Sequence, residues 1–195
     1  LKGLSPPKPE MTVRPWQKLY IDLSDFGSLD LSGNRYFLGV MDDFSRFLVG
    51  RCLPDKSAET VAYALADILL SNGVQGAMIR ADNGLEFRNT TFDSVMEKFN
   101  IRVAHISPYH AQSNRIERKF RSLGLKARLA NIHRDDWSRQ IPFVVFMVNN
   151  APTTALDGLS PSEVLTGRPM ELPLFHLRPD PELNEDPFLW SGYLS

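Results

Sequence analysis

Residues 79–128 read IRADNGLEFRNTTFDSVMEKFNIRVAHISPYHAQSNRIERKFRSLGLKAR, and this stretch decides how the rest of the chain is interpreted. A short apolar strand is expected to run into Asp82, because the next two residues, Asn83 and Gly84, are turn formers. A helix and a second strand follow, and a polar loop then leads to Glu117 at the start of a strongly basic helix. Carboxylates at the ends of adjacent elements, beside a basic surface, favour metal-dependent chemistry on nucleic acid.

The composition predicts one compact domain with terminal extensions. The chain has 195 residues, of which 43% are hydrophobic and 23% charged, enough for a sizeable core. Cys52 is the single cysteine, so a disulfide framework or a thiolate zinc cluster within the chain is excluded. We see no apolar run of membrane-spanning length and no signal peptide, and expect a reducing interior and no membrane partner. Because the first residue is leucine, we expect a fragment of a longer protein.

Charge is distributed unevenly along the chain. The net charge is −1, but residues 101–134 carry eight lysines and arginines and a single acid, Glu117, which gives +7 locally. Residues 171–195 carry five acids against Arg178 alone, or −4. A local basic face, rather than the total charge, sets the attraction for phosphate, so DNA remains a candidate partner.

The order of predicted elements indicates a mixed α/β domain. Alternating or apolar runs predict strands at 16–26, 36–41 and 47–53, joined by short turns into an antiparallel meander. Ser57 is expected to cap a helix at 58–70, and Thr91 a second helix whose apolar face includes Phe99. The remaining predicted elements are strands at 77–81 and 101–106, the basic helix from 117, a helix at 137–149 and a short helix starting at 160. We expect residues 1–15 to be a linker, 16–170 the core and 171–195 a proline-rich acidic tail.

Three acidic residues lie where predicted elements open onto loops: Asp22, Asp82 and Glu117. Two divalent cations about 4 Å apart, held by carboxylates, can activate an oxygen nucleophile and stabilise a departing sugar oxygen. Magnesium suits such a site because it prefers oxygen ligands and keeps bound water. Asp25 is the alternative to Asp22 at the first position.

The basic helix has two distinct faces. Glu117, Arg121 and Arg128 recur at helical spacing on one face, whereas an apolar stripe on another is suited to lie on the sheet. The side chains expected to contact DNA come from the turn after Asp82, the polar loop and this helix: Asn83, Tyr109, His110, Gln112, Asn114, Arg115, Arg118, Arg121 and Arg128.

Simpler interpretations apply to several of the same residue types. An aspartate at a strand end is more often a turn or capping residue than a ligand, and we expect this of Asp25, Asp42 and Asp43. His105 is expected to be a core or surface histidine, while His110 is balanced between loop structure and substrate contact. Trp137 is expected to anchor packing.

Four segments together resemble a known family: YFLGVMDDFSR (36–46), IRADNGLEF (79–87), SPYHAQSNRIERKFRSL (107–123) and GLSPSEVLTGRP (158–169). They are similar, in the right order, to the integrase catalytic core of LTR retrotransposons of the gypsy class and of retroviruses. The resemblance covers about residues 14–173. It implies an RNase H-like fold with a five-stranded sheet and a DDE triad, Asp22, Asp82 and Glu117, that binds two Mg²⁺ or Mn²⁺ ions.

The resemblance also implies an activity and partners. The reaction would be 3′-end processing of the element's DNA by hydrolysis, followed by strand transfer in which the new 3′-hydroxyl attacks target DNA. Joining two DNA ends requires at least two active sites, so a homo-oligomer is expected. The expected location is the nucleus, with the cytoplasm in transit.

One feature departs from the family pattern. Thirty-four residues separate Asp82 from Glu117, one fewer than is typical, and the shortening falls where relatives carry a glycine after Asn114. Loop closure depends weakly on length, so the triad is expected to assemble, but loss of a glycine from a catalytic loop predicts reduced activity. The family's upstream zinc domain and basic C-terminal domain are not evident in this sequence.

Two other interpretations compete with a retroelement integrase. A bacterial-type DDE transposase or an RNase H-like nuclease would use the same three acids. A host-domesticated, integrase-derived module would bind DNA or protein without catalysis, as the shortened loop and near-neutral charge would allow. The retained triad argues against this last interpretation.

Overall fold

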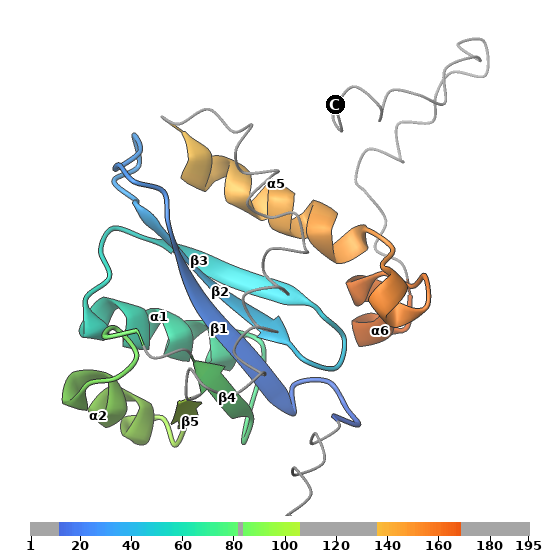
Figure 1. The fold of residues 1–195 in the computed structure, drawn as a ribbon, viewed down its shortest axis with the longest axis horizontal. Coiled ribbons are helices and arrows are strands. Elements are labelled where there is room, and N and C mark those ends of the chain that lie inside the picture. The colour runs from blue at the N-terminus through green and yellow to red at the C-terminus, as the bar shows by residue number, and fades with distance from the viewer. Residues whose placement is uncertain (1–11, 82–83, 106–135, 169–195) are drawn as a thin grey trace, which may run out of the picture.

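The computed structural model describes residues 12–81, 84–105 and 136–168, which form a mixed five-stranded sheet with helices on both faces (Figure 1). The strand order is β3-β2-β1-β4-β5. The first three strands form the predicted antiparallel meander, and β4 and β5 extend it in parallel. The strands are β1 (Lys18–Asp25), β2 (Tyr36–Asp42), β3 (Leu48–Leu53), β4 (Met78–Ala81) and β5 (Arg102–His105).

The two faces of the sheet bury separate apolar clusters. In β1, Leu19 and Ile21 point into a cluster with the helices α1 (Ala58–Ser71) and α2 (Thr90–Lys98). Tyr20, between them, packs against a second cluster with α5 (Trp137–Asn150) on the opposite face. Alternation of period two therefore assigns each β1 side chain to one helical layer. Figure 1 shows these layers, with α1 and α2 on one side of the sheet and α5 on the other.

The α1 and α2 helices are both present where the sequence predicts helices, but one of the two predicted N-caps differs. Ser57 caps α1, as predicted, by accepting a hydrogen bond from the Thr60 backbone N–H. The prediction that Thr91 caps α2 is wrong: Asn89 is the cap, and its Oδ1 accepts from the Phe92 N–H at 2.8 Å. Asparagine and threonine are both favoured caps, so the three consecutive candidates at 89–91 left the start ambiguous. Phe99 follows the end of α2, where it stays 37% exposed, so it is not part of the buried face.

The α5 helix contains a proline, and a cysteine compensates for it. Pro142 has no N–H, so the Ser138 carbonyl one turn earlier loses its helical donor. The Cys52 thiol on β3 lies 3.7 Å from that carbonyl oxygen and donates to it. The helix therefore runs through Pro142 with its freed acceptor bonded to the sheet.

The α5 helix also closes the outer edge of β3. The Asn149 side chain accepts from the Leu48 N–H at 2.8 Å and donates to the Leu48 carbonyl at 2.7 Å. Asn149 is itself held by Ser162, whose hydroxyl donates to the Asn149 carbonyl at 2.8 Å. Ser162 belongs to α6 (Pro161–Thr166), which begins with the predicted capping box between Ser160 and Glu163. A side-chain amide thus takes the place of a neighbouring strand.

Two further points bear on chain organisation. A short 3₁₀ helix, Thr154–Leu156, lies between α5 and α6 and was not predicted. Among the helices of the described segments, none has the length and apolar character needed to cross a bilayer. The predicted linker at 1–15 and tail at 171–195 fall mostly or wholly outside the described residues, so the domain boundaries remain predictions.

Candidate active site

Asp22 lies in the centre of the sheet, on the face covered by α5. Its neighbours Ile21 and Leu23 point to the α1 side, so alternation places Asp22 on the same face as Tyr20. The Asp22 side chain is partly exposed, and it makes contacts within the protein. A carboxylate at this position is accessible to a ligand approaching that face.

Two glycines continue the row that starts at Asp22. Asp22 pairs with Gly39 on β2, which in turn pairs with Gly50 on β3. The ring of Phe37 lies over Gly50, and a Cβ at Gly50 would come within 2.5 Å of the Leu38 carbonyl oxygen. Gly50 therefore leaves room for the Phe37 ring, which packs in the cluster with α5, and the position beside Asp22 carries no side chain.

The second candidate acid comes directly after β4 in the sequence. The last residue of β4 is Ala81, and Asp82 and Asn83 follow directly in the sequence but lie outside the described residues. Glu117 and the predicted DNA contacts from Tyr109 to Arg128 also lie outside them. Of the predicted triad, the structure places Asp22 alone.

The aspartates expected to be structural have structural partners. Asp42 is fully buried and accepts from the Ser45 backbone and hydroxyl and from the Trp16 N–H. Asp43 forms ion pairs with Lys18 at 3.2 Å and Arg46 at 2.9 Å. Both contacts fix the turn between β2 and β3, which confirms the prediction for these two residues.

Asp25, the alternative to Asp22, is committed to the β1–β2 hairpin. Its carboxylate forms a two-bond ion pair with the Arg35 guanidinium, both distances being 2.9 Å, and accepts from the Gly27 N–H. The Arg35 hydrogen bond outweighs partial burial and lowers the pKa of Asp25. These contacts favour Asp22 over Asp25 at the first position of the triad.

Asp30 is a buried carboxylate whose role the sequence did not reveal. It accepts from the backbone N–H groups of Ser32 and Asn34 in its own turn and of Ser138 at the start of α5. Burial opposes its ionisation, but the Ser138 and turn hydrogen bonds prevail and lower its pKa. Beside this contact Trp137 is 2% exposed and stacks on Phe26 at 3.8 Å, which confirms it as a packing anchor. Asp30 therefore fixes α5 to the hairpin that follows β1.

Other kinds of catalytic group find little support. Burial, with a smaller contribution from the Asp30 charge, raises the pKa of the Cys52 thiol to about 12, so it is not a thiolate nucleophile near neutral pH. Within the described segments, no three histidine, cysteine or acidic side chains cluster as metal ligands would. His105 ends β5, and its side chain is not among those described.

Comparison with known proteins gives one consistent result. The family model described as "Integrase core domain" matches residues 13–111, just over half of the chain. The Pro-Pol polyprotein of simian foamy virus type 3 is 29% identical over 147 residues, 74% of this chain. The Pol polyprotein of the Drosophila melanogaster transposon 412 is 26% identical over 145 residues, 73% of this chain. The chain spans only 12% of the length of each of these two relatives.

Solved structures agree on the fold. The catalytic core domain of BIV integrase superposes with a TM-score of 0.56 at 17% identity, covering 77% of this chain and 94% of that one. The simian T-cell lymphotropic virus intasome, solved with the PP2A regulatory subunit B56 gamma, gives 0.64 at 15% identity, covering 84% of this chain and 61% of that one. The fold is the RNase H-like fold of retroviral integrase cores.

Proposed function

Because this chain belongs to the integrase core domain family, we propose that it is the catalytic core of a retroelement integrase. In this role it is a polynucleotidyl transferase acting on DNA. It hydrolyses the 3′ ends of the element's DNA, and each new 3′-hydroxyl then attacks a phosphodiester of the target DNA and displaces a 3′-oxygen. Retroviral and transposon Pol polyproteins among the relatives support this proposal over the domesticated binding module.

The observation that carries the proposal is the pairing of β1 with β4. The two strands run parallel with a constant offset of sixty positions, from Lys18–Met78 to Tyr20–Arg80. The same offset, continued two positions further, would bring Asp82 opposite Asp22 at the inter-strand spacing of about 4.8 Å. Neighbouring carboxylates at that spacing repel unless cations lie between them. We therefore infer that the pair is a metal-binding pair.

The donor set fits magnesium or manganese. Asp22, Asp82 and Glu117 supply only carboxylate oxygens, which is the ligand type these ions prefer. Asp25, Asp42 and Asp43 are held by protein partners and are not needed for the site. Two bound ions would stabilise the charge on the attacking and departing oxygens.

DNA is the proposed partner. The local charge of +7 over residues 101–134 supports phosphate binding by Arg115, Arg118, Arg121 and Arg128. The polar loop and Asn83 would contact the strand being cut or joined. Arg121→Ala should weaken DNA binding and reduce the slope of log affinity against log salt by about 1. An unchanged slope would remove Arg121 from the interface.

We also propose that the chain works as a homo-oligomer in the nucleus. Two DNA ends must be joined at once, which needs at least two active sites. The simian T-cell lymphotropic virus intasome, a structural neighbour, supports an assembly of this kind.

The test is strand transfer of a labelled oligonucleotide with Mg²⁺ or Mn²⁺. Asp22→Asn, Asp82→Asn and Glu117→Gln should each abolish metal-dependent cleavage and joining while the protein stays folded. Asp25→Asn is the matched control. It removes a carboxylate from the same strand, β1, but this carboxylate binds Arg35 and is not a proposed metal ligand. Normal activity in Asp82→Asn would overturn the assignment of the three metal ligands. The assignment would also fail if Asp25→Asn stayed folded and was the only variant to lose activity.

A second variant tests the shortened loop. A glycine inserted after Asn114 restores the spacing typical of the family. Higher activity in this variant than in the unmodified chain would show that the shortening slows the reaction. Equal activity would mean that the loop tolerates the loss, as weak dependence of closure on length allows.

A further inference from the structure

Arg80 on β4 is a cation close to the candidate metal ligand Asp22. In the parallel pair of β1 and β4, Arg80 lies directly opposite Tyr20, two residues before Asp22. Two residues along a strand and one strand across separate the Cα atoms of Arg80 and Asp22 by about 8 Å. Ile79 and Ala81, which flank Arg80, point into the cluster with α1 and α2. Alternation therefore places Arg80 on the opposite face of the sheet, the face that carries Asp22.

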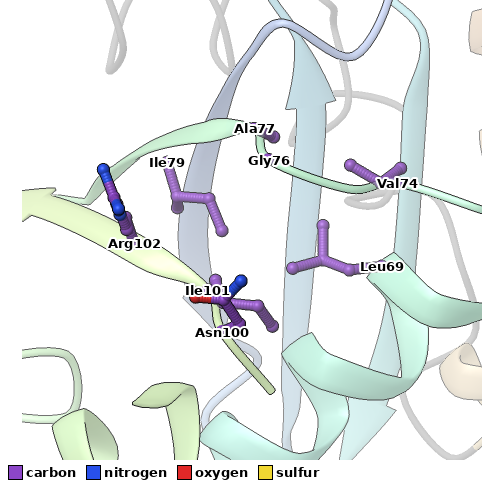
Figure 2. A pocket seen from close by; sticks show the side chains of 8 residues that line it. All are labelled: Leu69, Val74, Gly76, Ala77, Ile79, Asn100, Ile101 and Arg102. Carbon is purple, nitrogen blue, oxygen red and sulfur yellow. The ribbon is translucent and has the colours of Figure 1, made fainter. Parts of the chain in front are cut away.

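The other cations on this face of the described strands are farther from Asp22. Lys18 lies four residues before Asp22, or about 13 Å along β1, and forms an ion pair with Asp43. Arg102 is on β5, where the register aligns it with Lys18 across β4, about 16 Å from Asp22. Figure 2 shows Arg102 at the start of β5, beside a pocket of about 180 Å³. On this face of the described strands, Arg80 is therefore the cation nearest to Asp22.

A carboxylate that serves as a metal ligand needs another counter-ion while the metal is absent. Carboxylates gathered at a metal site repel one another unless a positive charge lies near them. The long aliphatic stem of arginine can carry its guanidinium across this separation, and both Arg80 and Asp22 are partly exposed and make contacts within the protein. We propose that Arg80 is a positioning residue, which pairs with the Asp22 carboxylate before the metal binds and competes with the metal for it. This inference rests on the proposed function, in which Asp22 is a metal ligand.

The pair has two consequences of opposite sign. Without metal, the guanidinium of Arg80 offsets the charge of the Asp22 carboxylate and stabilises the folded protein. With metal, the same positive charge repels the divalent ion. Coulomb's law in water, applied to charges of +2 and +1 about 8 Å apart at an ionic strength of about 0.01 M, gives a metal affinity about fourfold lower than without the arginine. The same calculation for Arg102, at about 16 Å, gives less than about twofold.

The experiment uses the full chain without DNA, at an ionic strength of about 0.01 M. Arg80→Gln should lower the melting temperature of the metal-free protein by about 2–4 °C. It should also tighten Mn²⁺ binding about fourfold, measured by EPR of the free ion during a titration. Arg80→Lys keeps the charge and should keep most of the parental stability and metal affinity. Arg102→Gln is the matched control, because it removes an exposed arginine from the same face of the sheet, and should change Mn²⁺ affinity by less than about twofold.

A double-mutant cycle tests the pair itself. Asp22→Asn removes the proposed partner, so in that background Arg80→Gln should no longer lower the melting temperature of the metal-free protein. Additive effects of the two substitutions would overturn the proposal. Unchanged Mn²⁺ affinity together with weaker DNA binding in Arg80→Gln would also overturn it, because Arg80 would then be a phosphate contact. A parent chain that binds no Mn²⁺ would contradict the proposed function instead, and the cycle in the metal-free protein would still decide whether Arg80 and Asp22 are paired.

Discussion

Replacing Asn149 by alanine should expose how α5 closes the β3 edge. The change removes two hydrogen bonds between the Asn149 side chain and the backbone N–H and carbonyl of Leu48. Both residues are buried. An unsatisfied buried N–H or carbonyl costs about 1–3 kcal/mol, so we expect the loss of both partners to lower the free energy of unfolding by about 3 kcal/mol. At about 2–4 °C per kcal/mol for a chain of this size, the melting temperature should fall by about 6–12 °C.

The assay is equilibrium unfolding in urea, followed by tryptophan fluorescence, to which Trp137, stacked on Phe26, contributes. Asn72→Ala is the matched control: the Asn72 amide also donates to a backbone carbonyl, that of Ile68 at 2.7 Å, but at an exposed helix end. It should cost less than about 1 kcal/mol. Asn149→Asp keeps the acceptor for Leu48 but loses the donor and buries a charge, so it should be at least as damaging as alanine. If Asn149→Ala cost no more than Asn72→Ala, the amide would not be what closes this edge.

Three further changes test other contacts. Gly50→Ala should destabilise the fold by about 1–3 kcal/mol through overpacking against the Phe37 ring, and Phe37→Leu should recover part of that loss; additive effects in urea unfolding would contradict this. Asp30→Asn should lower stability at pH 7. Because folding lowers the Asp30 pKa, its contribution is constant above about pH 4 and is lost as pH falls through the folded pKa, so the gap between variant and parent should shrink at pH 3; a constant gap would contradict ionic anchoring. Cys52, with its pKa raised to about 12, should resist thiol reagents in the native protein at pH 9 and react at once in urea; fast native labelling would contradict its burial.

Local signals in the sequence were sufficient for most of the fold. Period-two alternation predicted the strand at 16–26 that contains β1, and the capping box of Ser160 and Glu163 predicted the start of α6. Errors arose where neighbouring residues offered equivalent chemistry. Asn89, Thr90 and Thr91 can all cap a helix, and only the packing of Phe92 into the core selects Asn89.

Contacts between distant residues could not be predicted. Asp30 and Ser138 lie 108 positions apart, and Asn149 and Leu48 lie 101 apart. Neither aspartate in a turn nor asparagine near a helix end carries a local sign of its burial. The same limit applies to Pro142, whose freed acceptor is satisfied by Cys52 only because α5 crosses β3 there.

The candidate site could be predicted only in part from local sequence. Asp22 follows from its position on a strand, but its preference over Asp25 could not be read from spacing, because both lie near the end of the same run. The structure separates them through Arg35, which occupies the Asp25 carboxylate. Asp82 and Glu117 lie outside the described residues, so their assignment remains a prediction from sequence and family.

The most direct test of the central claim locates the metal on the chain itself. Fe²⁺ is loaded in place of Mg²⁺, ascorbate and peroxide generate radicals at the bound ion, and the backbone cuts are mapped by mass spectrometry. We predict cuts clustered near residues 22, 82 and 117, suppressed by excess Mg²⁺, absent in Asp22→Asn and retained in Asp25→Asn. Cuts near Asp25 or the Asp42–Asp43 turn that persist in Asp22→Asn would contradict a metal site built from Asp22, Asp82 and Glu117.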